Sequence, residues 1–144
     1  MAANYPVTSF HFQVDWGGAR VGFSEVSGLD IEVEVIEYRE GSDPEQIVRK
    51  IPGLKKFPNI ICKRGLLRGD NDLFEWMNTH KQGAVERRTV TISLLDEEHQ
   101  PIIVWKAKNA WPVKITGPDL KAAGNEIAIE ALEICHEGLT IENG

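Results

Sequence analysis

Three glutamates in one strand-like segment, Glu32, Glu34 and Glu37, are the residues of this 144-residue chain whose type and spacing first suggest chemistry. A pair of carboxylates can act as general acid and base, or can hold a cation. Strand residues two apart share one face, however, and no histidine, serine or cysteine stands beside these glutamates as a nucleophile system. The pattern therefore favours a charged surface over an active site, and we predict that the protein is not an enzyme.

The remaining residues that could hold a metal or a cofactor are scattered along the chain. The four histidines match neither H-E-x-x-H nor a Cys/His zinc spacing, so we expect no metal site. The segment "GPDLKAAGNE" has glycines but lacks the dinucleotide and Walker patterns, which predicts a loop with tight turns and no cofactor. In Arg68-Gly69-Asp70, an adhesion tripeptide in other contexts, Asp70 is better explained as the cap of a helix.

Composition predicts one globular domain spanning residues 1–144. A hydrophobic content of 42% is ordinary, and a net charge of -6 with a pI near 5.2 argues against a general nucleic-acid binder. Cys62 and Cys135 lie far apart inside apolar runs, which predicts reduced thiols and a reducing origin. The start "MAANYPVTSF" lacks the features of a signal peptide, and no run reaches the ~18 apolar residues of a membrane span. We therefore expect synthesis in the cytoplasm and no membrane insertion.

Alternation of apolar and polar residues predicts a mostly β fold. The firmest strands cover residues 10–16 and 89–94; further strands are expected at 59–65, 101–107 and 111–116. Gly17-Gly18 predicts a hairpin that returns as a second strand over 19–28. A third strand follows over 31–40, in which Ile31, Val33 and Val35 form a core-facing side and a bulge falls between Val35 and Ile36.

One segment, about residues 71–81, has the pattern of an α-helix. Asp70 can cap it, an apolar face includes Leu73 and Trp76, and Gly83 lies just past its end. The segment "EIAIEALEICHEG" is ambiguous, because its composition favours a helix while its alternation is typical of a strand. Residues 40–58 carry three prolines and no sustained period, which predicts a long loop with a function of its own.

The charges divide into two consecutive blocks. Residues 25–45 hold eight acidic groups and one base, Arg39, whereas residues 46–69 hold seven basic groups and no acid. Two such surfaces can join copies head to tail, and the alternative is that both are merely solvated. Binding of nucleic acid by the basic block is disfavoured by the overall acidity. The candidate assembly residues are Glu32, Glu34, Glu37, Arg39, Arg49, Lys50, Ile51, Leu54, Lys55, Lys56 and Phe57.

Five blocks of sequence, in order and over nearly the whole chain, resemble one protein family. They are "GFSEVSGLDIEVEVIEYREG", "RKIPGLKKFPNIICKRG", "LFEWMN", "RRTVTISLLDEE" and "WKAKNAWPVKITGPDLKAAGNEIAIEALEICHEGL". The family is that of the tail tube proteins of contractile phage tails and the inner tube proteins of extracellular contractile injection systems.

The resemblance implies a compact antiparallel β-barrel or sandwich with one flanking helix, in which "EIAIEALEICHEG" is a strand. It implies a structural subunit of hexameric rings that stack into a hollow tube within a contractile sheath. The implied partners are further copies of the chain, the sheath, baseplate and spike proteins, a cap or terminator, and cargo or DNA in the lumen. It also implies that residues 40–58 contact neighbouring subunits, and that the protein ends up in a bacterial tail or extracellular particle.

Three other functions remain open at this point. One is a carboxylate-dependent enzyme, which would be distinguished by a closed pocket around Glu32, Glu34 and Glu37. A specialised paralogue that joins the tube to the spike or baseplate would share the same sequence pattern. A monomeric β-domain that binds a partner would also fit the composition, and it would be distinguished by remaining monomeric at high concentration.

Overall fold

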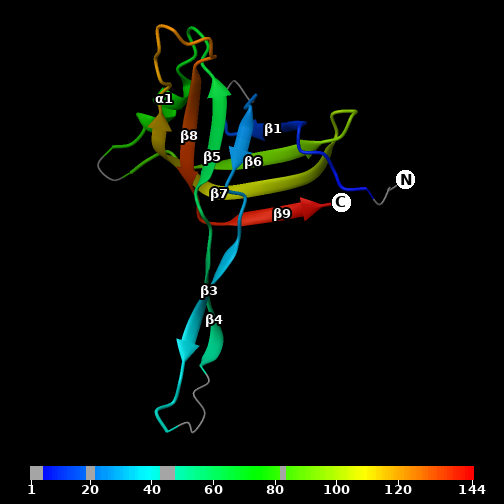
Figure 1. The fold of residues 1–144 in the computed structure, drawn as a ribbon, viewed down its shortest axis with the longest axis vertical. Helices are drawn as coiled ribbons and strands as arrows, with labels where there is room; N and C mark the ends of the chain where they lie inside the picture. Colours follow the sequence, from blue (N-terminus) through cyan, green and yellow to red (C-terminus); the bar gives the residue numbers. More distant parts are fainter. Residues whose placement is uncertain (1–4, 19–21, 43–47, 82–83) are drawn as a thin grey trace.

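The body of the molecule consists of two antiparallel sheets that share one long strand (Figure 1). The computed structural model describes residues 5–18, 22–42, 48–81 and 84–144. In the first sheet the order is β1 (Phe12–Asp15), β6 (Arg88–Leu95), β7 (Pro101–Thr116) and β9 (Leu139–Asn143). In the second sheet β7 is followed by β8 (Ile129–Cys135), β5 (Ile60–Gly65) and β2 (Glu25–Ser27). The predicted mostly β, antiparallel fold is confirmed.

Strand β7 belongs to both sheets because its two halves pair with different neighbours. The first half pairs with β6 and β9, and the second half, from Trp111 onward, pairs with β8. Asn109, where the strand passes from one sheet to the other, has a φ of 52°, in the left-handed region that asparagine tolerates better than most residues. The two strands expected at 101–107 and 111–116 are thus one continuous strand.

The core lies between the sheets and is closed at one end by a short helix. Inward-facing residues of β1, β5, β6 and β8 are buried, and Leu73 and Trp76 of α1 (Asp72–Met77) join them. The ring of Trp76 lies 5.6 Å from that of Trp16. The helix is shorter than the predicted 71–81. Asp70 accepts a hydrogen bond from the Asp72 N–H at 3.2 Å, while the expected end at Gly83 lies outside the described residues.

One local prediction in the body was wrong. Strand β1 pairs with β6, and β2 pairs with β5, so these two strands do not form the hairpin expected at Gly17-Gly18. Residues 19–21 of that expected second strand lie outside the described residues. The segment "EIAIEALEICHEG", which was ambiguous from its composition, contains the strand Ile129–Cys135 between β5 and β7, as the family resemblance implied. Burial of Leu132 and Ile134 in the core outweighs propensity here.

A two-stranded arm projects from the body along the longest axis of the molecule (Figure 1). It is formed by β3 (Glu32–Tyr38) and β4 (Arg49–Lys56), which pair with each other and with no other strand of the described chain. The expectation of a structureless 40–58 segment was therefore wrong for 49–56. The prolines had suggested a loop, but Pro52 lies within β4, next to an irregularity in the strand register. This irregularity falls between Val33 and Val35, and not between Val35 and Ile36 as the sequence had suggested.

Candidate assembly surface

The arm has two faces, and each carries apolar residues flanked by charges. Residues directly opposite in an antiparallel pair point to the same face, and neighbours along a strand point to opposite faces. One face therefore presents Ile36, Tyr38 and Ile51, because Ile36 lies opposite Ile51 in the ladder. The other face presents Val33 and Val35, with Val35 opposite Pro52. A two-stranded ribbon with apolar side chains on both faces cannot bury either face by itself.

The apolar side chains of the arm are open to solvent in the single chain. Val35 is 57% exposed, Ile36 50% and Leu54 79%, and every residue of β3 is exposed. The sequence pattern had suggested that Ile31, Val33 and Val35 face a core within the chain, which was wrong. The sequence did contain an indication that both faces of this strand are apolar. Val35 and Ile36 are adjacent, so their side chains point to opposite faces of the strand. A core-facing strand with one solvated face would have kept a single parity.

The acidic and basic blocks lie side by side within one chain. Glu32 is opposite Lys56 and Glu37 is opposite Lys50 across the arm, and the Lys56 ammonium lies 3.8 Å from the Glu34 carboxylate. The glutamates of β3 thus face the lysines of β4 within the same hairpin. Because both partners are about half exposed, such a pair contributes only ~0–1 kcal/mol. A role of these charges between subunits stays a prediction.

The second half of the basic block, from Phe57 onward, belongs to the body and not to the arm. Phe57, a candidate assembly residue, is half-buried against the core, with its ring 5.6 Å from that of His136. Arg64 is buried, and its Nε donates to Glu130 at 2.7 Å while Nη2 donates to Asp70 at 3.3 Å. Arg64 therefore does not contribute to the surface charge of the basic block. It connects β5 to β8 and to the start of α1 through its hydrogen bonds.

The strands at the margins of the body offer further places for contact. Among the described residues, β1, β2 and β9 are each hydrogen-bonded to a neighbour on one side only. Two of these margins carry ion pairs: Lys63 with Glu25 at 3.4 Å and Lys106 with Glu142 at 3.7 Å. Charges of this kind discourage unspecific strand addition at an edge.

In the described ranges, thiols and other metal-ligating side chains do not gather into a cluster. Both cysteines are free; burial raises the pKa of Cys62 to about 12, and burial also raises the pKa of the half-buried Cys135. In the same part of the chain no group of three or more histidine, cysteine, aspartate or glutamate side chains could hold a metal ion. Nor does that part contain a helix with the length and apolar character needed to cross a membrane.

Comparison with solved structures finds the same fold in proteins of contractile particles. A chain of the cryo-EM structure of the anti-feeding prophage cap, described as the tube-terminating cap, is 34% identical, with a TM-score of 0.89 over 100% of this chain and 95% of that chain. A chain of the sheath–tube complex of the extracellular contractile injection system PVC is 31% identical, with a TM-score of 0.89 over 98% of this chain and 94% of that one. Hcp1 from Flavobacterium johnsoniae, at 15% identity and a TM-score of 0.57 over 92% of this chain and 95% of its own, shares the fold alone.

The fold and these neighbours define a class of protein, the structural subunits of tubes in contractile tails and injection systems. A family model described as T4-like virus tail tube protein gp19 matches residues 8–140. The chain therefore belongs to the T4-like tail tube protein family, as its sequence blocks indicated. A search of curated proteins returned no match.

Proposed function

We propose that this chain builds the wall of a tube by forming hexameric rings that stack through their arms. The observation that carries the proposal is the arm, whose two faces both expose apolar side chains in the single chain. An isolated two-stranded ribbon is marginally stable in water, so it needs covering by other surfaces. Contact with other copies supplies that cover, and the one-sided margins β1, β2 and β9 supply positions for lateral strand contacts.

The wider assembly follows from the family and from the particles in which the neighbours occur. We propose that the tube lies within a sheath, joins a baseplate at one end and a cap or terminator at the other, and encloses a lumen for cargo or DNA. The neighbours in the sheath–tube, cap and terminator structures of such particles support this set of partners. On this proposal the chain is made in the bacterial cytoplasm and ends up in a tail or an extracellular particle.

Electron microscopy of the purified protein in negative stain tests the proposal. Hollow rings or tubes with six subunits around the axis are the expected result. A chain that stays monomeric at high concentration would instead be an isolated β-domain that binds some other partner, and the wall function would be wrong.

Substitution of an arm residue tests which surface forms the wall. Ile36→Asp should prevent assembly, because it places a charge in the apolar centre of one arm face, while the thermal midpoint of the single chain should stay close to that of the parent. Phe74→Asp is the matched control, since Phe74 is similarly exposed but lies on α1 and outside the arm. Equal loss of assembly in both variants would count against the arm.

We further propose that the wall has no catalytic residue. The Glu34→Gln/Glu37→Gln variant should keep the fold and abolish no reaction. A turnover by the parent chain that disappeared in this variant would refute the proposal.

A further inference from the structure

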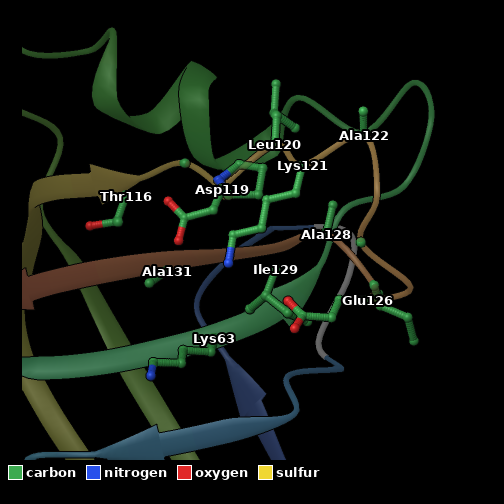
Figure 2. A pocket seen from close by; sticks show the side chains of 14 residues that line it. Lys63, Thr116, Asp119, Leu120, Lys121, Ala122, Glu126, Ala128, Ile129 and Ala131 are labelled. Atoms are coloured by element: carbon green, nitrogen blue, oxygen red, sulfur yellow. The ribbon is translucent and has the colours of Figure 1, made fainter.

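A loop at the opposite end of the molecule from the arm borders a cavity that the wall function has not yet used. Residues 117–128 connect β7 to β8 at the end of the second sheet that lies farthest from the arm (Figure 1). Between loop and sheet lies an open cavity of about 660 Å³, with Lys63 of β5 and Ile129 and Ala131 of β8 on its sheet side (Figure 2). A cavity of this size is within the ~300–1,000 Å³ range of sites that bury a ligand or several side chains.

The surroundings of the cavity combine apolar surface with charges of both signs. Leu120 is 87% exposed and Ile127 is 79% exposed, although both residues line the cavity. Figure 2 shows the side chains of Asp119 and Lys121 extending from the loop toward β8. Within the described chain neither of these two charges takes part in an ion pair. The cavity therefore suits an occupant that brings apolar side chains and charges of both signs.

The arm has that composition and lies in the right place. Leu54 and the apolar residues on both arm faces are exposed, and neither Glu37 nor Lys50 forms an ion pair in the part of the chain described. Figure 1 places the arm and the 117–128 loop at opposite ends of the longest axis, so the arm cannot reach the cavity of its own chain. A contact between opposite ends is heterologous, and it propagates along the axis from copy to copy.

We infer that the 117–128 cavity is the receptor for the arm of a second copy of this chain. This inference rests on the proposed wall function and specifies the surface that the arm of one ring meets in the next. Leu120 and Ile127 cover one apolar face of the incoming arm, and Lys121 and Asp119 pair with its glutamates and lysines. Each of the two surfaces carries both positive and negative charges. Opposite charges therefore meet only when the arm docks in the correct register, because a shifted register brings like charges together.

Cross-linking between introduced cysteines tests the inference on the assembled full-length chain. The variants are made in a Cys135→Ser background, because Cys135 is a free, half-buried thiol that would itself react with a maleimide. In that background Leu54→Cys is combined in turn with Leu120→Cys, Lys121→Cys or Ile127→Cys, and assemblies are treated with a short bis-maleimide before denaturing electrophoresis. All four positions are exposed, so the fold should tolerate the changes. A heterologous contact links a different cysteine of each copy, which gives a ladder of trimers and longer products, whereas each single variant gives dimers at most. The matched control pairs Leu54→Cys with Glu97→Cys, an exposed position in the β6–β7 turn.

The outcomes separate this inference from the wall function. Ladders from at least one cavity pair, with none from the Glu97 control, are the expected result. Tubes seen by microscopy without a ladder from any of the three pairs, or with an equal ladder from the control, would overturn the receptor and leave the wall function standing. Absence of tubes from the parent chain would overturn the wall function itself.

A second variant checks the energetics of the same contact. Ile127→Asp should raise the concentration needed for assembly by about tenfold or more, because it places a charge where the arm is expected to pack. The thermal midpoint of the single chain should not change, since Ile127 is exposed. An unchanged assembly concentration would overturn the receptor.

Discussion

Arg64 illustrates at the scale of one residue how a charge can be structural and not functional. Its side chain is 1% exposed and is held by Glu130 and Asp70, with the rings of Trp16 and Phe23 close to its guanidinium. Arg64→Met should lower the free energy of unfolding by about 3–5 kcal/mol, because it leaves the largely buried Glu130 without its cation. Urea titration of the single chain measures the loss.

The adjacent residue provides the control for this prediction. Lys63→Met breaks the half-exposed pair with Glu25 and should cost no more than ~1 kcal/mol. If the two variants lost equal stability, burial would not be the reason for the importance of Arg64.

The two cysteines should react at different rates in the folded chain. Cys62 is buried, and its pKa of about 12 leaves almost no thiolate at pH 8, whereas Cys135 is half-buried. We expect N-ethylmaleimide to modify Cys135 first, with a rate that increases with pH as its thiolate forms, and to modify Cys62 only when the chain unfolds. Mass spectrometry over time follows both steps. Rapid modification of a Cys135→Ser variant would contradict this order.

At the scale of elements, the arm should depend on the charges of its two strands. The Lys55→Glu/Lys56→Glu variant sets two new carboxylates across from Val33 and Glu32, next to Glu34. Like charges across a strand pair destabilise it, so assembly should weaken while the body keeps its stability. Sedimentation at low salt and at ~1 M salt, where the Debye length is about 3 Å, measures how much of the effect is electrostatic.

The control for the arm variant is a pair of lysines in the body. Lys108→Glu/Lys114→Glu changes the net charge equally, but both lysines lie on β7 and away from the arm. If the arm variant assembled like the parent at both salt concentrations, Ile51 and Leu54 would carry the contact without help from the charges.

The elements of the body were largely predictable from sequence, and the exceptions have physical reasons. Alternation located β1, β5 and β6, because each buries one side of its residues in the core. Pairing of β1 with β6, about 80 residues away, leaves no local signal, so the nearest turn suggested a hairpin instead. Ile129–Cys135 is a strand because it is paired within a sheet, and the composition of the segment alone does not indicate this pairing.

At the scale of the whole molecule, the arm should be the least protected part of the single chain. It contributes nothing to the core cluster, and every residue of β3 is exposed. Amide hydrogens of β3 and β4 should exchange rapidly in the monomer and slowly in tubes, while those of β6 and β7 should be protected in both. Hydrogen exchange with mass spectrometry compares the two states. Arm amides that were equally protected in the monomer would show that the ribbon needs no partner.

The candidate site was partly predictable, because charge blocks are visible in sequence but their geometry is not. The sequence suggested Glu32, Glu34 and Lys56 as residues of a contact between subunits. The structure brings all three together within one hairpin, and their role between subunits stays a prediction. The exposed second face of the arm and the 117–128 cavity were not predicted. Both arise from how far the arm extends and where the loop folds back, which are properties of the tertiary structure.

The sharing of β7 between the sheets has a consequence for the order in which the chain folds. The β6–β7 hairpin closes through a short local turn, whereas β1 pairs with β6 across a large sequence separation, so the hairpin should form before β1 is added. Neither sheet can be completed until β7 has formed, because β8 and β9 both pair with it. Substitutions that shorten buried side chains along β7 should therefore slow refolding, whereas similar substitutions in the arm should leave the refolding rate unchanged. The arm is thus free to vary between assemblies without disturbing the folding of the subunit.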